Sequence, residues 1–114
     1  MNIMIVTRDI KAGIGTTVKN LVWQLEKLDE INLITVVGPG SFPVKTNKVK
    51  FITVKIRGTY FFTKEPAFIY EANKVIIEEL KRNSYDIIHL HSNISKYKIF
   101  NKSYSRIPII STFQ

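Results

Sequence analysis

An apolar segment at the start of the chain leads into two closely spaced glycines and then into a helical pattern. Residues 2–7 are mostly apolar, Gly13 and Gly15 follow, and leucine and valine then recur at helical spacing from about Thr16 to Leu28. This order predicts a strand, a glycine turn and an amphipathic helix, which is the layout of a phosphate-binding βα unit. Glycine lets the backbone approach a ligand closely, and the free amides and dipole of a helix N-terminus favour an anion.

The rest of the chain alternates short apolar runs with a second, longer helical pattern. The expected strands cover residues 31–37, 49–56, 86–91 and 107–113, the long helix covers 68–83, and 94–104 is ambiguous, an irregular basic helix being one interpretation. Nearly continuous apolar strands are typical of a parallel sheet that is covered on both faces. We therefore expect residues 1–114 to form a single α/β domain, a Rossmann-like three-layer sandwich with strand order 3-2-1-4-5.

In a sheet of that order, a ligand crevice opens between the carboxyl ends of the first and fourth strands, because their crossover helices lie on opposite faces. His91 ends the fourth strand, and Gly13 and Gly15 follow the first, so we expect them to meet there. His89 shares a strand face with His91. For His89, a histidine packed under a helix with satisfied nitrogens is the more ordinary interpretation.

The sequence lacks the residues that several kinds of chemistry require. The chain contains no cysteine, which excludes disulfides, thiolate metal sites and cysteine nucleophiles and favours an intracellular setting. No third ligand stands at a useful spacing from His89 and His91, so we expect neither a metal nor a cofactor. Val18 replaces the third glycine of a dinucleotide-binding fingerprint, and the lysine that an ATPase phosphate loop needs before Thr16 and Thr17 is missing.

The formal charge of +8 is large for 114 residues and is unevenly distributed. One basic cluster comprises Lys45, Lys48, Lys50, Lys55 and Arg57, and a second follows the last acidic residue, Asp86. A phosphorylated ligand, an anionic membrane surface or nucleic acid would suit this charge, as would lysines that serve solubility alone. Nucleic acid is the least favoured, because the aromatic residues 60–62 are not interleaved with the basic ones. No apolar run approaches the roughly 20 residues of a membrane span.

Three segments stand in a characteristic order along the chain. They are the strand ending in Thr7 with its glycine turn, the run 85–92 with its two histidines, and the proline-containing run 107–113 that ends in Thr-Phe. In order and spacing they resemble the N-terminal domain of GT-B glycosyltransferases of the family 4 type, over nearly the whole chain. The resemblance implies sugar transfer from a nucleotide-sugar donor to a sugar or lipid acceptor, in a cleft between two Rossmann-like domains and without an obligatory metal.

By this resemblance the chain is the acceptor-side half of the cleft. Backbone amides of the glycine turn would face a phosphate, and the end of the fourth strand would line the acceptor side. The expected ligand-binding residues are Gly13, Ile14, Gly15, Thr16, His91, Ser92 and Asn93. Gln114 stands where the family has a histidine, so an acid/base or charge-stabilising role is lost there. The family's C-terminal donor domain is absent from the sequence, and we expect the isolated chain to be inactive.

Other classes of function fit the same sequence. The domain could be a non-catalytic Rossmann-like binding module that holds an anionic lipid, glycan or nucleic acid on its basic face. It could also be a truncated product with a structural role, forming a homodimer through its last strand. As an enzyme, it would need a longer chain or a separate donor-domain subunit to complete the cleft. The expected location is the cytoplasm, with peripheral membrane contact as one option.

Overall fold

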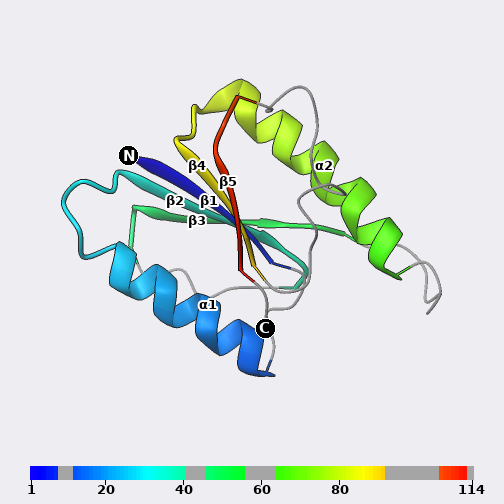
Figure 1. Ribbon diagram of the computed structural model, residues 1–114, viewed down its shortest axis with the longest axis horizontal. Helices are drawn as coiled ribbons and strands as arrows, with labels where there is room; N and C mark the ends of the chain where they lie inside the picture. Colours follow the sequence, from blue (N-terminus) through cyan, green and yellow to red (C-terminus); the bar gives the residue numbers. More distant parts are fainter. Residues whose placement is uncertain (8–11, 41–45, 56–63, 92–105, 113–114) are drawn as a thin grey trace.

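Two helices lie on opposite faces of a central sheet (Figure 1). The computed structural model describes residues 1–7, 12–40, 46–55, 64–91 and 106–112, and the structural statements below concern those residues. Helix α1 (Ala12–Leu25) covers one face, and helix α2 (Lys64–Arg82) covers the other. Neither helix has an apolar stretch long enough to cross a bilayer in the described part of the chain. The layers are those of the expected α/β sandwich.

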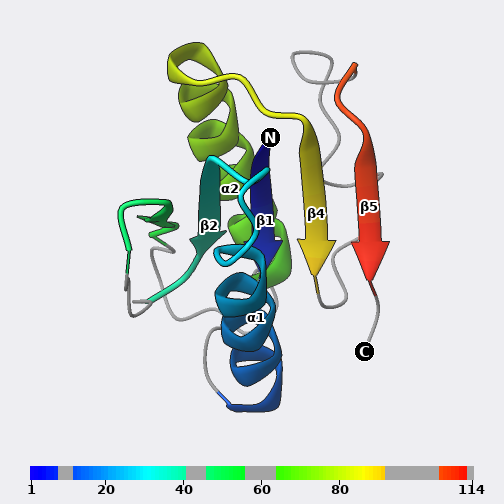
Figure 2. The ribbon, with the colours of Figure 1, turned by 90° about the vertical axis from the view of Figure 1, so that its left-hand side faces the viewer.

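The described strands form one parallel sheet, in which β1, β4 and β5 can be followed side by side (Figure 2). The strands are β1 (Asn2–Thr7), β2 (Leu33–Gly38), β3 (Val49–Thr53), β4 (Ile87–His91) and β5 (Ile109–Thr112). Their order is β3-β2-β1-β4-β5, and each neighbouring pair is parallel. The predicted Rossmann-like fold and the predicted strand order are therefore confirmed.

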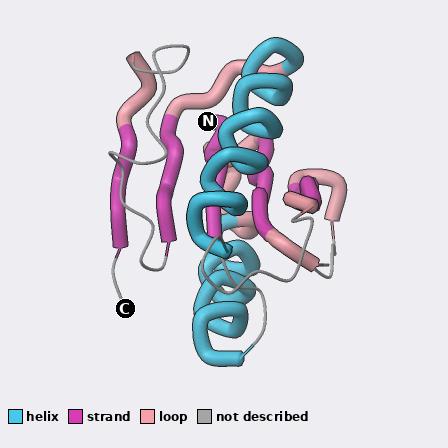
Figure 3. The backbone as a smooth tube through the Cα atoms, turned by 90° about the vertical axis from the view of Figure 1, so that its right-hand side faces the viewer, coloured by secondary structure: helices cyan, strands magenta, loops and turns pink. Residues whose placement is uncertain are grey.

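Side chains of the central strand β1 alternate between two cores, as expected for a strand that is buried on both faces. The core beneath α1 includes Ile3, Ile5, Val18 and Val22, and the core beneath α2 includes Met4, Val6, Phe68, Ala72 and Ile76. Helix α2 crosses the middle of the sheet (Figure 3). The odd-numbered residues of β1 therefore face α1. Thr7, at the end of the strand, belongs to this set.

The prediction of a glycine turn ahead of the first helix is wrong. Helix α1 begins at Ala12, not near Thr16, so that Gly13 and Gly15 lie in its first turn. Packing of Val18 and Val22 against the sheet fixes the helix and outweighs the weak helix propensity of glycine.

The other element bounds lie close to those expected. Helix α2 begins at Lys64, earlier than predicted, and β3 ends at Thr53, earlier than predicted. The ambiguous segment 94–104 and the aromatic residues 60–62 lie outside the described residues.

Two lysines of the first basic cluster bind the chain itself. Lys48 Nζ donates to the backbone carbonyls of Glu26 and Leu28, both at 3.3 Å, just beyond the end of α1. Lys50 pairs with a buried carboxylate, described next, whereas Lys55 is exposed. The remaining two members of the cluster lie outside the described residues. Lys48 and Lys50 therefore stabilise the fold. Their ammonium groups are bonded within the chain and do not form a row of free cations along the strand.

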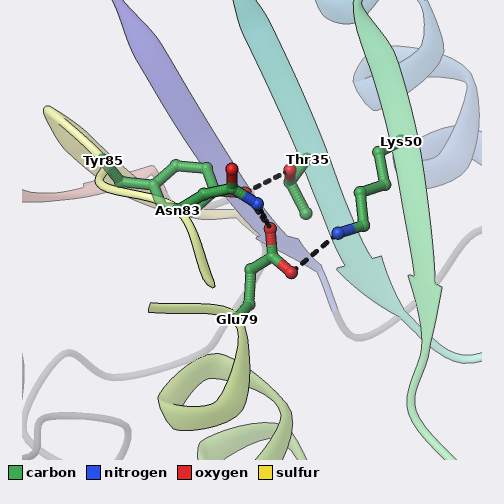
Figure 4. A network of polar contacts seen from close by, with 5 residues as sticks. All are labelled: Thr35, Lys50, Glu79, Asn83 and Tyr85. Atoms are coloured by element: carbon green, nitrogen blue, oxygen red, sulfur yellow. Dashed lines mark hydrogen bonds and ion pairs between the residues drawn. The ribbon is translucent and has the colours of Figure 1, made fainter. Parts of the chain in front are cut away.

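A buried carboxylate joins α2 to the sheet (Figure 4). Glu79 is 2% exposed, and its oxygens accept hydrogen bonds from Lys50 Nζ at 2.8 Å, Asn83 Nδ2 at 2.9 Å and the Tyr85 hydroxyl at 2.5 Å. Because the Tyr85 proton goes to Glu79, the Thr35 hydroxyl on β2 donates to the Tyr85 oxygen, at 2.5 Å. These contacts, the Glu79 cluster, link α2, β2, β3 and the segment that leads into β4.

The Glu79 cluster holds its carboxyl group ionised. Burial by itself raises the pKa of Glu79, but hydrogen bonds from Lys50, Tyr85 and Asn83 and the charge of Lys50 outweigh it, so the pKa lies below its ordinary value of 4.5. Burial, and then the neighbouring Glu79 carboxylate, raise the pKa of Tyr85. The pair is therefore a carboxylate and a neutral phenol around neutral pH.

The lowered pKa of Glu79 predicts a loss of stability in acid. Stability linked to this group is present above its unfolded-state pKa and is lost as the pH falls through its folded-state pKa. We expect the free energy of unfolding to decrease on acidification, and the variant Glu79→Gln to lack this part of the decrease. Urea unfolding of both proteins at neutral and acidic pH measures it. The same pH dependence in both proteins would show that Glu79 does not supply it.

Candidate functional site

The carboxyl ends of β1 and β4 lie next to each other, at the edge of the sheet beyond which α1 begins (Figure 2). Thr7 ends β1, His91 ends β4, and the two are register partners. His91 pairs on its other side with Thr112, the last residue of β5. In open parallel sheets, ligands bind at this edge.

The register that places Thr7 beside His91 is fixed at the opposite ends of the same strands. The Asp86 carboxylate accepts a hydrogen bond from the backbone amide of Asn2 at 2.7 Å, and the Asp86 amide donates to the Asn2 carbonyl at 2.8 Å. The Asn2 side-chain amide also donates to the carbonyl of Ser84, at 2.8 Å. The aspartate that leads the fourth strand in the sequence is thus a structural anchor for β4.

His91 lies on the face of the sheet that α1 covers. Ile5 belongs to the core beneath α1, and Thr7 shares its face because side chains alternate along a strand. Register partners of adjacent parallel strands share a face, so His91, opposite Thr7, and His89, opposite Ile5, lie there too. The N-terminus of α1 and the His91 ring are therefore on the same side and at the same end of the sheet.

The ring of His91 is buried without hydrogen-bond partners. The residue is 2% exposed, and neither Nδ1 nor Nε2 bonds to any described residue. The ring meets that of His89 edge-on, with centroids 5.7 Å apart and planes at 73°. Burial lowers the pKa of both histidines, and the neighbouring His91 contributes to lowering that of His89. At neutral pH His91 is a neutral imidazole with one donor and one acceptor to satisfy.

The first turn of α1 presents its backbone amides at the carboxyl end of the sheet. The N–H groups of Ala12, Gly13 and Ile14 have no acceptor within the helix. The turn contains no acidic side chain that would neutralise the positive end of the helix dipole. Glycine at positions 13 and 15 leaves the backbone open to close approach. The arrangement suits an anionic group.

The remaining predicted site residues divide into two groups. Gly15 and Thr16 lie in α1 directly after Ile14, whereas Ser92, Asn93 and Gln114 lie outside the described residues. In the ranges that the structure describes, no group of three histidine, aspartate or glutamate residues is placed to hold a metal ion.

Thr7 is a candidate site residue that the sequence analysis did not identify. It is fully buried, ends β1 and lies opposite His91. Its position as the last residue of the first apolar strand, at the edge where ligands bind, was the signal that could have identified it.

The fold is also found in a known nucleotide-binding protein. The chain is similar to the crystal structure of a UGT transferase from Siraitia grosvenorii in complex with UDP, with a TM-score of 0.63 and 12% sequence identity. The similarity covers 99% of this chain and 24% of that one, so this chain spans about a quarter of that protein's length. At this identity the similarity establishes the fold, which is the Rossmann-like fold of GT-B glycosyltransferases.

The fold and the match to a family model together define a glycosyltransferase-like α/β domain. The family model of glycosyltransferase family 4 matches residues 12–113, and the chain therefore belongs to that family. No curated protein matches the sequence. The predicted resemblance to family 4 glycosyltransferases is thereby confirmed.

Proposed function

We propose that this domain is the acceptor-side half of a glycosyltransferase that moves a sugar from a nucleotide-sugar donor to a sugar or lipid acceptor. The observation that carries the proposal is the convergence, at one sheet edge, of the α1 N-terminus with the buried, unpartnered imidazole of His91. Membership of glycosyltransferase family 4 supports it.

The proposed roles follow from the chemistry of each group. The first-turn amides, from Gly13 and Ile14 in particular, hold a phosphate, with Gly15 and Thr16 completing the turn. His91 lines the acceptor side together with Ser92 and Asn93. Transfer would then depend on positioning of the reactants and on stabilisation of the charge that develops on the departing nucleoside diphosphate. Gln114 would supply hydrogen bonds only.

The donor side of the cleft must come from another domain on this proposal. A GT-B cleft lies between two Rossmann-like domains, and the sequence supplies one of them. The second would be part of a longer chain or a separate subunit, and the 114 residues alone would not transfer sugar. A lipid acceptor would bring the domain to the cytoplasmic face of a membrane.

The alternative of a basic binding module receives little support from the described part of the first basic cluster. It depends on a face of free cations, but Lys48 and Lys50 are bonded to carbonyl oxygens and to Glu79 within the chain. We therefore place the anion site at the α1 N-terminus and not on the strand that carries these lysines.

An anion at the first turn of α1 predicts a specific binding response. In a titration with inorganic pyrophosphate followed by NMR, we expect the backbone amide signals of residues 12–16 to shift, and those near Leu25 to stay unchanged. The variant Gly13→Asp places a carboxylate at the same helix end, so it should weaken binding by about tenfold or more.

The variant Asn20→Asp is the matched control, because it adds the same charge at an exposed position further along the helix. It should bind pyrophosphate nearly as well as the unsubstituted protein. Equal weakening by both variants would indicate a non-specific charge effect. Shifts confined to amides elsewhere would contradict the proposed site.

A further inference from the structure

One side of helix α2, away from its buried face, carries four charged residues of alternating sign. In chain order they are Glu71, Lys74, Glu78 and Lys81. Spacings that alternate between three and four residues place side chains on one stripe of a helix. Within the helix, Lys74 Nζ lies 3.7 Å from Glu71 Oε1, and Lys81 Nζ lies 3.3 Å from Glu78 Oε1. These four residues, the α2 charge row, therefore alternate acid and base toward the carboxyl end of the helix.

The α2 charge row lies at the surface of the described structure, on the helix that crosses the sheet in Figure 3. Its side chains are between 34% and 68% exposed. Lys74 and Glu78 line an open pocket together with Val75 and with Ile52 of β3. Val75 and Ile77 are half-buried and flank the row on its two sides, since 3.6 residues make one turn. The charges thus run along a partly apolar surface that no described segment covers.

The α2 charge row is complementary to itself when two copies of the helix lie antiparallel. In a pair related by a two-fold axis, residue i of one copy contacts residue j of the other, and j contacts i. With the axis at the level of residue 76, Lys74 lies opposite Glu78 of the second copy, and Glu71 lies opposite Lys81. Each contact occurs twice, so every charge in the row meets its opposite. A parallel pair in register would bring like charges together.

The flanking apolar side chains also meet in the antiparallel pair. Val75 and Ile77 stand one residue on either side of the axis level, so each lies near its own counterpart in the second copy. Apolar area removed from water contributes to binding, and the charges determine orientation and register. One helix pair is smaller than a standard interface of about 800 Å² per partner, so the association is weak. The net charge of +8 opposes it, although salt screens that repulsion.

We infer that α2 is a dimerisation surface, on which a second copy of this chain packs its own α2 antiparallel. The register is the one in which Lys74 pairs with Glu78 of the other copy. The candidate site lies on the face of the sheet that α1 covers, whereas α2 covers the opposite face. The dimer therefore leaves the candidate site open, and the inference does not depend on the proposed function.

Two single variants test the pairing, because each places like charges opposite each other twice in its own homodimer. We expect Lys74→Glu and Glu78→Lys each to weaken self-association by about tenfold or more, in sedimentation equilibrium at about 0.15 M salt. They change the net charge in opposite directions, so a weakening that both share does not arise from net charge. Both positions are exposed, so we expect both variants to fold.

An equimolar mixture of the two variants should associate about as tightly as the unsubstituted chain. In the mixed dimer, Glu at position 74 of one copy faces Lys at position 78 of the other, and Glu78 faces Lys74 at the second contact. Lys27→Glu is the matched control, because it makes the same charge change as Lys74→Glu at an exposed position beyond the end of α1. This control should keep the self-association of the unsubstituted chain.

Three outcomes would overturn the inference. The first is an unsubstituted chain that stays monomeric up to about 1 mM, where even an association of only about 4 kcal/mol is half complete. The second is a dimer that neither variant weakens, since it would form through another surface, such as the edge of β5. The third is a mixture that associates no more tightly than the separate variants, which would show that positions 74 and 78 do not face each other.

Discussion

Replacing Lys50 with methionine is expected to lower the free energy of unfolding by about 3 kcal/mol, because it leaves a buried charge without its counterion. The Glu79 side chain is 1% exposed, and Lys50 Nζ lies 2.8 Å from its carboxylate. The hydrogen bonds from Asn83 and Tyr85 remain in the variant, but they come from neutral groups. Urea unfolding at neutral pH measures the loss.

Lys81→Met is the matched control for that measurement. Lys81 pairs with Glu78 on the same helix at 3.3 Å, but the two side chains are 68% and 63% exposed. Exposed pairs contribute little, so we expect a change below about 1 kcal/mol. Similar losses for Lys50→Met and Lys81→Met would mean that burial does not distinguish the two ion pairs.

A double variant separates the cost of an unpaired charge from the cost of lost packing. Glu79→Gln removes the charge and keeps nearly the same volume, so adding it to Lys50→Met should restore at least about 1 kcal/mol. Further destabilisation in the double variant would show that the cost of Lys50→Met arises from lost packing and not from an unpaired carboxylate.

The Glu79 cluster also affects the candidate site. Tyr85 belongs to the cluster, and the next residue, Asp86, bonds to Asn2 at the start of β1. Both contacts hold the chain immediately before β4, and His91 is the residue at the other end of that strand. Polar contacts at one edge of the sheet therefore help to hold the strand that carries the imidazole at the other edge.

Much of the fold could be predicted because its signals are local. Continuous apolar runs such as residues 3–6 are typical of strands buried on both faces, and the helical spacing of Phe68, Ala72 and Ile76 is typical of a helix packed on a sheet. The start of α1 could not be predicted in the same way. Glycine favours a turn by its local propensity, and the packing that makes Gly13 helical involves residues elsewhere in the fold.

The roles of the charged residues could not be predicted from the sequence, because they depend on partners far away along the chain. In the sequence, Lys48 and Lys50 look like the surface lysines around them, but they bond to groups that are far away along the chain. The exact register, which the sequence does not show, places Thr7 directly beside His91. The position of His91 at the carboxyl edge, in contrast, could be predicted from strand order alone.

Sugar transfer should be absent from the isolated chain and present once a donor-binding domain is supplied. The described residues include the first turn of α1 and the unpartnered ring of His91, which the proposal assigns to one wall of a two-domain cleft. Transition-state stabilisation in such a cleft needs reactants held from both sides, so one wall gives no transfer above the uncatalysed background.

The most direct test is a transfer assay with radiolabelled nucleotide sugars and a mixture of lipid and sugar acceptors. It compares the isolated chain with the same chain fused to the donor-binding domain of a glycosyltransferase of family 4. We expect labelled product from the fusion and none from the isolated chain. Labelled product from the isolated chain would contradict the proposal that these 114 residues are the acceptor-side half of the enzyme.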